Sequence, residues 1–161
     1  MKSNKLKMYR QGDVAIERVS SLPSGLKPIP LESGKVILAY GEVTGHHHAF
    51  AAEDCEKYID DNGGEFFKVN GRDFNNIKLP ILRRWNSQVM VDHPEYGIIE
   101  FAVVDVLVEG NSVTIPGRVG LLVHDEHTAH GIAAGVYKGA GATGTVRQRE
   151  YSPEAIRNVA D

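Results

Sequence analysis

The chain has 161 residues, of which 42% are hydrophobic and 24% charged, and its formal net charge at pH 7 is −3. A chain of this length typically forms one domain that folds without disulfides or a metal, so we predict a single domain over residues 1–161. The slightly acidic balance argues against nucleic-acid binding through a basic face, and no apolar run approaches the ~18 residues of a membrane-spanning helix.

Short runs of β-branched and apolar residues, separated by turn residues, predict a mainly antiparallel all-β fold. The N-terminal residues carry basic side chains but no apolar stretch, so no signal peptide is expected. Residues 61–64 and 109–111 are typical of hairpin connections, and many short strands favour a barrel or a sandwich. The expected strands span residues 13–19, 35–40, 65–69, 88–91, 97–108, 112–115, 118–124, 135–138 and 143–150.

A helix is expected only at the C-terminus. Ser152, Pro153 and Glu154 form a helix start signal, with a capping residue, a proline at the first helical position and an acidic residue in the first turn. Residues 70–96 have the weakest pattern, and we interpret them as an insertion or a long loop. Residues 134–144 are rich in glycine and alanine, which is typical of a flexible turn between the last two strands.

Histidine is the most informative residue type, because six of the seven histidines lie in two short windows, residues 46–48 and residues 124–130. In the first window, side chains that alternate along a strand would place His46 and His48 on one face and His47 on the other. In the second, an apolar strand ends in a loop of imidazoles and carboxylates. Two ligands from each window would hold one divalent transition metal, either Zn, Fe, Mn or Ni. The predicted metal ligands are His46, His48, His124 and His127.

Two other interpretations of these windows stay open, namely a metal-free polar or catalytic site and incidental surface histidines. Glu126 and Glu53 are candidate ligands, or bases acting on metal-bound water, with a surface acid as the alternative for each. Glu126 is the favoured catalytic acid or base. His47 and His130 are further candidates for the site, whereas His93 lies outside both windows and is expected to be an ordinary surface histidine.

The first window resembles the cupins, small β-barrels whose metal is held by a His-x-His pair, a glutamate and a later histidine. His46 and His48 are followed after four residues by Glu53, which is the cupin spacing. The second region departs from the cupin pattern, because residues 116–118 invert the expected Pro-x-Gly and His124 falls late. The resemblance implies a metal on a cupin-like β-barrel.

Several motifs together carry a closer resemblance. They are Gln-Gly-Asp at 11–13, Gly-Glu-Val-Thr-Gly-His-x-His at 41–48, His-x-Glu-His at 124–127, Gly-Val-Tyr at 135–137 and Arg-Gln-Arg-Glu-Tyr at 147–151. These motifs resemble those of a family of small uncharacterised proteins of bacteria and tailed phages, and they cover most of the chain except residues 70–117. The resemblance implies that the four predicted ligands are signature positions, that His47 and His130 vary more, and that no activity is assigned.

Three further residues bear on partners and location. Arg147 and Arg149 would bind an anionic substrate if they face the cavity, and a solvated strand face is the alternative. Cys55 has acidic neighbours that disfavour a thiolate, so we expect a structural cysteine. A single cysteine also fits a reducing compartment, here the cytoplasm of a bacterium or an infected host cell.

The sequence thus favours a small soluble metalloprotein with a mononuclear histidine-rich site, and one interpretation is a metal-dependent enzyme acting on a small polar substrate. One alternative is a binding or regulatory module with a structural metal, in which protein ligands fill every position. The other is a phage-associated assembly or host-interaction protein. A homo-oligomer is expected because a long apolar strand at 98–108 needs a covering partner. Nucleic-acid and membrane partners are not expected.

Overall fold

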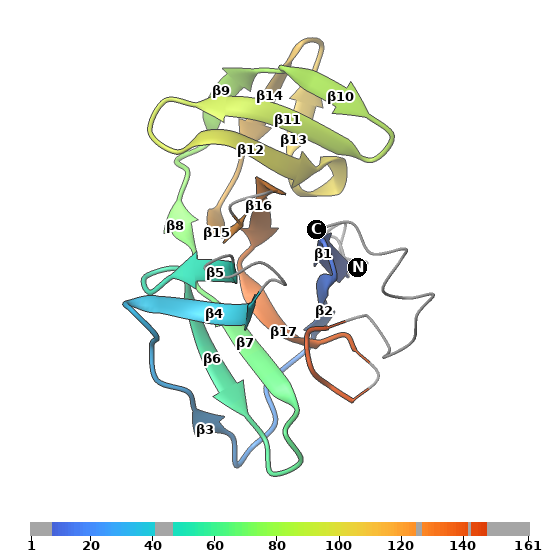
Figure 1. Cartoon of the computed structure of the whole chain (residues 1–161). Helices are drawn as coiled ribbons and strands as arrows, with labels where there is room; N and C mark the ends of the chain where they lie inside the picture. Colours follow the sequence, from blue (N-terminus) through green and yellow to red (C-terminus); the bar gives the residue numbers. More distant parts are fainter. Residues whose placement is uncertain (1–7, 41–46, 125–126, 142, 148–161) are drawn as a thin grey trace.

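The structure is a computed structural model that describes residues 8–40, 47–124, 127–141 and 143–147. It confirms the all-β prediction, and among these residues the strands form sheets of six, eight and three strands, none of which closes into a barrel. Figure 1 shows an upper lobe, formed by residues 74–117, and a lower lobe, formed by the other described residues. The helix expected from Ser152 lies outside the described residues.

The six-stranded sheet lies in the lower lobe (Figure 1). Its order is β1-β2-β17-β7-β6-β3, and every neighbouring pair is antiparallel. The hairpin predicted at 61–64 is confirmed, because it connects the paired strands β6 and β7. The strands are β1 (Met8–Gln11), β2 (Val14–Val19), β3 (Lys27–Pro28), β6 (Cys55–Ile59), β7 (Glu65–Val69) and β17 (Gly135–Gly139).

The eight-stranded sheet continues from one lobe into the other. Its order is β10-β11-β12-β16-β15-β5-β4, with β8 paired to β15. The first three strands belong to the upper lobe, and β12 joins the lower lobe through a parallel pairing with β16. The strands are β4 (Lys35–Tyr40), β5 (His47–Ala51), β8 (Arg72–Asp73), β10 (Arg83–Trp85), β11 (Gln88–His93), β12 (Gly97–Ala102), β15 (Arg118–His124) and β16 (His127–Ala133).

The three-stranded sheet, in the order β13-β14-β9, completes the upper lobe. The hairpin predicted at 109–111 is confirmed, because it connects β13 to β14. Residues 70–96 form strands and not a long loop, since β8 to β11 lie within them. The strands of this sheet are β9 (Ile77–Pro80), β13 (Leu107–Glu109) and β14 (Ser112–Ile115), and a 3-10 turn η1 (Val103–Asp105) precedes β13.

The expected long strand at 97–108 is interrupted. β12 ends at Ala102, η1 turns the chain, and β13 continues in a different sheet. β12 also lies between β11 and β16, so both of its edges have hydrogen-bonded neighbours. The strand therefore offers no unpaired edge that would call for a second copy of the chain, and the homo-oligomer stays a prediction without that support.

The buried apolar residues form two clusters, one in each lobe, and the upper cluster also includes Val119 and Leu121 of β15. The alternation of buried and exposed side chains along β11 and β12 places Val89, Val91, Ile99 and Phe101 on one face, against the three-stranded sheet. Burial of each such side chain contributes roughly 1.5–3 kcal/mol. The core of the lower lobe consists of Tyr9, Val14, Ile16, Val36, Leu38, Ala39, Phe50, Cys55, Phe67, Val69, Leu122, Ile132, Tyr137 and Val146.

A buried ion pair fixes the place where the chain passes into the upper lobe. Asp54 is fully buried, and its carboxylate accepts hydrogen bonds from Arg72 at 2.9 and 2.8 Å and from the backbone N–H of Leu121 at 3.1 Å. Gly71 has φ +69° and packs so closely on Val119 that an added Cβ would lie 2.6 Å from a backbone carbon. Only glycine fits this crossing point.

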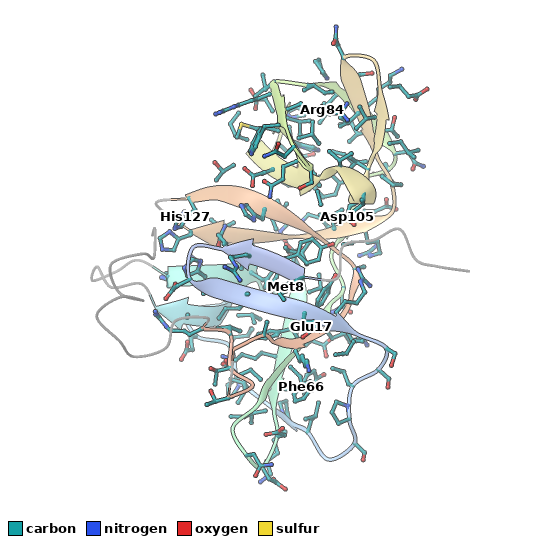
Figure 2. The ribbon with its side chains drawn as sticks, turned by 90° about the vertical axis from the view of Figure 1, so that its right-hand side faces the viewer. Met8, Glu17, Phe66, Arg84, Asp105 and His127 are labelled. Atoms are coloured by element: carbon teal, nitrogen blue, oxygen red, sulfur yellow. The ribbon has the colours of Figure 1, made fainter. Side chains whose placement is uncertain are left out.

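Side chains also connect the lobes. The hydroxyl of Tyr9 on β1 donates a 2.6 Å hydrogen bond to Asp105, which lies at the junction of the lobes in Figure 2. Glu100 and His130 face each other across the parallel pair β12 and β16, with 3.1 Å between carboxylate oxygen and Nε2. The upper lobe is therefore held to the lower one by backbone pairing, by the hydrogen bond between Tyr9 and Asp105, and by the contact between Glu100 and His130.

Candidate functional site

Three of the four predicted ligands meet at one end of the lower lobe. His48 lies on β5, His124 ends β15, and His127 begins β16. β15 pairs with both other strands, with His124 opposite His127, so the register brings the three imidazoles together. The ring centroids of His48 and His124 lie 4.2 Å apart, those of His124 and His127 4.7 Å, and those of His48 and His127 5.9 Å. We call these residues the histidine cluster, and Figure 2 shows His127 at the end of its strand.

The other predicted site residues either lie away from the histidine cluster or fall outside the residues that the structure describes. His46 and Glu126 lie outside the described residues, so their roles stay predictions. Glu53 is 71% exposed and pairs with Arg72 at 3.3 Å, beside the crossing between the lobes. His130 lies three residues beyond His127, which places it on the opposite face of β16. There it pairs with Glu100 and lines a cavity of about 240 Å³ at the junction of the lobes.

The hydrogen bonds of Gln11 determine the tautomer of His48, that is, which of its ring nitrogens carries the proton. The side-chain amide nitrogen of Gln11 donates to the carbonyl oxygens of Leu122 and Thr128, at 3.0 and 3.1 Å. This orients the amide, so its oxygen accepts the 2.8 Å hydrogen bond from His48 Nδ1. His48 therefore carries its proton on Nδ1, and Nε2 has the lone pair.

Asp13 is a member of the site that the histidine pattern did not reveal. Its side chain is buried, and its Oδ1 atom lies 3.8 Å from His48 Nε2. Its other oxygen forms an ion pair and hydrogen bond with the Arg147 guanidinium. The Gln-Gly-Asp motif at 11–13 was the available signal, because Gln11 and Asp13 both contact His48.

The glycine-rich segment places Arg147 at the site. It was expected to be a flexible turn, but its backbone is closely packed and bonded. An added Cβ at Gly141 would overlap the carbonyl oxygen of Arg147, and Gly141 N–H donates to Thr145 at 2.7 Å. Val146 O accepts from Ala15 N–H at 2.8 Å, which sets Arg147 beside β2. Arg147 thus pairs with Asp13, while Arg149 lies outside the described residues.

Burial keeps His48 neutral. Its side chain is 1% exposed, and burial is the main cause that lowers its pKa from 6.5 to about 4. The neighbouring imidazole of His124 lowers the pKa further, whereas the Asp13 carboxylate acts in the opposite direction. At neutral pH His48 is therefore unprotonated at Nε2, and the lone pair of this nitrogen is available to bind a metal cation.

The cluster does not form a preorganised metal site. Among the described residues, no group of three or more His, Cys, Asp or Glu side chains is arranged to hold a metal ion. The planes of His48 and His124 differ by 30°, and those of His48 and His127 by 21°. Ring nitrogens carry their lone pairs in the ring plane, so nearly parallel rings do not direct them at a common point. Nε2 of His48 and of His127 is buried and makes no hydrogen bond to any described residue.

Two residues outside the cluster are structural. Cys55 is 1% exposed, and burial, followed by the adjacent acidic side chains, raises the pKa of its thiol, as expected for a structural cysteine. His93 was expected at the surface, but it is 7% exposed, and its Nδ1 accepts hydrogen bonds from the backbone N–H groups of Glu95 and Tyr96 at 3.0 and 3.3 Å. Pro94 follows it, so His93 organises the turn between β11 and β12.

Comparison with known proteins yields one family. A family model described as a domain of unknown function (DUF8820) matches residues 10–103. This range includes Asp13 and His48 and ends before His124 and His127. No curated protein and no solved structure matches the chain. The match confirms the expectation of an uncharacterised family, while the expected phage origin stays a prediction. Within the part of the chain that the structure describes, no helix is long and apolar enough to span a membrane.

Proposed function

The chain belongs to the family of the domain of unknown function DUF8820, and from its own site we propose that it binds one divalent transition metal through His48, His124 and His127. His46 is the fourth ligand predicted from the sequence. The proposal concerns Zn, Fe, Mn or Ni, because imidazole nitrogen suits Zn, Fe and Ni and also occurs with carboxylate in Mn sites.

The buried nitrogen atoms of the cluster carry this proposal. A buried polar atom without a hydrogen bond costs about 1–3 kcal/mol, and such atoms usually have a partner. Nε2 of His48 and of His127 makes no hydrogen bond to a described residue, although both lie against other imidazoles. A metal ion bound by these nitrogens would compensate the cost.

The hydrogen bonding of His48 suits a metal ligand. A histidine bound to a metal almost always donates its other ring N–H to an acceptor, which orients the ring and fixes its tautomer. His48 donates Nδ1–H to Gln11, which leaves Nε2 for the metal. Metal binding requires the stacked rings to turn about their side-chain torsions until their nitrogens converge.

The activity class follows from the coordination number. If a water molecule occupies one position, the metal would activate it or orient a small polar substrate, with Glu126 as the predicted acid or base. If protein ligands fill every position, the metal is structural and the protein is a binding or regulatory module. X-ray absorption of the metal-loaded protein separates these two cases, because it counts nitrogen and oxygen ligands.

The test is the metal content of the untagged protein, purified without added metal or chelator and measured by mass spectrometry. We expect about one equivalent of a single metal in the natural chain and less than about a tenth in the His124→Ala, His127→Ala double variant. The matched control is His130→Gln, on the same strand but paired with Glu100, which retains the metal. Metal-free natural protein, or equal content in the double variant, would contradict the proposal.

A further inference from the structure

The cavity of about 240 Å³ at the junction of the lobes lies where strands β12 and β16 separate. Their parallel register joins Ile99 to Ala129 and Glu100 to His130, and beyond this point β12 stays paired with β11 while β16 stays paired with β15. β1 lies beside β16 at the junction (Figure 1), and its residues 8–10 line the same cavity. The cavity is therefore produced by the meeting of the two lobes and not by a single loop.

The contact between Glu100 and His130 forms the centre of the polar lining. Their side chains are 14% and 17% exposed, and 3.1 Å separates the carboxylate oxygen from Nε2. This contact uses one of the two carboxylate oxygens and one of the two ring nitrogens, so the pair retains capacity for further hydrogen bonds. Arg10 and Gln88 belong to the same lining. The cavity thus offers hydrogen-bond donors and acceptors together.

The charges around the cavity select the class of ligand. The Glu100 carboxylate disfavours an anion, and the Arg10 guanidinium disfavours a cation. A hydroxyl group is uncharged and both donates and accepts, so it can bond to a carboxylate, a guanidinium, an amide or an imidazole in either protonation state. The apolar part of the lining, which includes Phe101, Ala102 and Gly131, suits the C–H groups of such a compound. The lining therefore fits a neutral compound with several hydroxyl groups.

The volume of the cavity limits the size of the ligand. A cavity of ~150 Å³ takes up a benzene-sized molecule, so about 240 Å³ accommodates roughly ten non-hydrogen atoms. We propose that the junction cavity binds a neutral polyhydroxylated compound of the size of a pentose, with Glu100 and His130 as its polar anchors. His130 and His127 lie on opposite faces of β16, so this site is separate from the histidine cluster. Binding here does not require the metal proposed above.

The experiment is a titration of the isotope-labelled full chain, kept in chelator, with D-ribose, D-xylose and erythritol, followed by two-dimensional amide NMR spectra. We expect at least one of these compounds to cause saturable shifts at residues 8–10, 87–88, 100–102 and 130–131, with a dissociation constant in the millimolar range. Ethanolamine and propionate, a small cation and a small anion, should bind at least about 10-fold more weakly. Absence of saturable shifts with all three polyols, or tighter binding of a charged probe, would overturn the proposal.

Two variants test whether the compound binds in the cavity. Ala102→Leu places a larger apolar side chain in the lining without removing a polar group, and it should abolish the saturable shifts. Glu100→Gln keeps the size of the side chain but removes its charge, and it should weaken binding at least about 10-fold. Glu17→Gln is the control, because Glu17 is a half-exposed acid on β2 that pairs with Lys138. Its affinity should stay within about twofold of that of the natural chain.

The two variants test different parts of the proposal. Unchanged binding in Ala102→Leu means that the compound binds outside the cavity, which contradicts the proposal. Unchanged binding in Glu100→Gln overturns the role of Glu100 as an anchor. Circular dichroism checks the fold of each variant. If Glu100→Gln does not fold, Ala102→Leu decides, because that substitution leaves the contact between Glu100 and His130 in place.

Discussion

The upper and lower lobes differ in what they bury besides apolar side chains. In the described part of the upper lobe, His93 is the one buried polar residue, in a core built around Val89, Ile99 and Phe101. The lower lobe and the crossing between the lobes bury a larger polar set. Gln11, Asp13 and His124 lie around His48, and Asp54 lies at the crossing, where it pairs with Arg72.

The two settings of buried histidine show why this difference matters. His93 accepts two backbone hydrogen bonds at Nδ1 and packs against Phe74 and Tyr96, so folding alone accounts for its presence. In the histidine cluster, His48 has one ring nitrogen bonded to Gln11 and the other facing a carboxylate. A buried histidine is thus a functional candidate when its hydrogen bonds are incomplete, and burial by itself does not make it one.

The largest expected effect is on the upper core. Phe101 is 2% exposed and packs against Phe74, so Phe101→Ala leaves a cavity and should lower the free energy of unfolding by about 3–5 kcal/mol. The free energy of unfolding is measured by urea titration, with the fluorescence of Trp85, the only tryptophan of the chain, as the signal. Leu107→Ala, at a side chain 58% exposed, is the control and should change stability by less than about 0.5 kcal/mol. Equal effects of the two variants would contradict the separate upper core.

The next largest effect is the loss of stability of the protein at acidic pH, caused by His48 in the lower lobe. His48 has a pKa of about 4 in the folded chain against 6.5 when unfolded, so the unfolded chain binds more protons between these values. Stability is therefore full above pH 6.5 and falls as the pH drops toward 4, by about 3 kcal/mol for this residue. Unfolding of the metal-free protein in chelator at several pH values measures the loss. His48→Gln removes the titrating group, so its free energy of unfolding should fall less as the pH drops from 6.5 to 4. An identical pH profile in the two proteins would contradict the lowered pKa of His48 as the cause of the lost stability.

The smallest of the three effects is expected for substitution of His93, the buried histidine that we interpret as structural. His93→Ala leaves two backbone N–H groups without their acceptor and should lower the free energy of unfolding by about 1–3 kcal/mol. Metal content should not change, because His93 lies in the upper lobe, away from the histidine cluster. His93→Asn retains a side-chain acceptor and should recover part of the stability. A loss of metal in His93→Ala would remove the distinction between the two kinds of buried histidine.

Sequence patterns predicted the strands whose side chains alternate or are strongly β-branched. β4, β7, β14 and β15 have the predicted bounds, because each is an apolar run that ends at turn residues. β16 was not predicted, since three of its first four residues, His127, Thr128 and His130, are polar and the strand therefore lacks the apolar signal. Its neighbours β12 and β15 provide its backbone hydrogen bonds, and such long-range pairing overrides local composition.

The sequence by itself determined the all-β class and the two histidine windows, because strand patterns and residue clustering are local properties. Only the tertiary structure decided which residues of those windows meet and what surrounds them. Gln11 and His48 are 37 residues apart, and Asp13 and Arg147 are 134 apart, yet each pair is in contact. These contacts depend on the register of β5 against β15 and on how the two sheets pack. Such long-range pairing leaves no periodic signal in the chain, so the position of Asp13 beside His48 was not predictable from spacing.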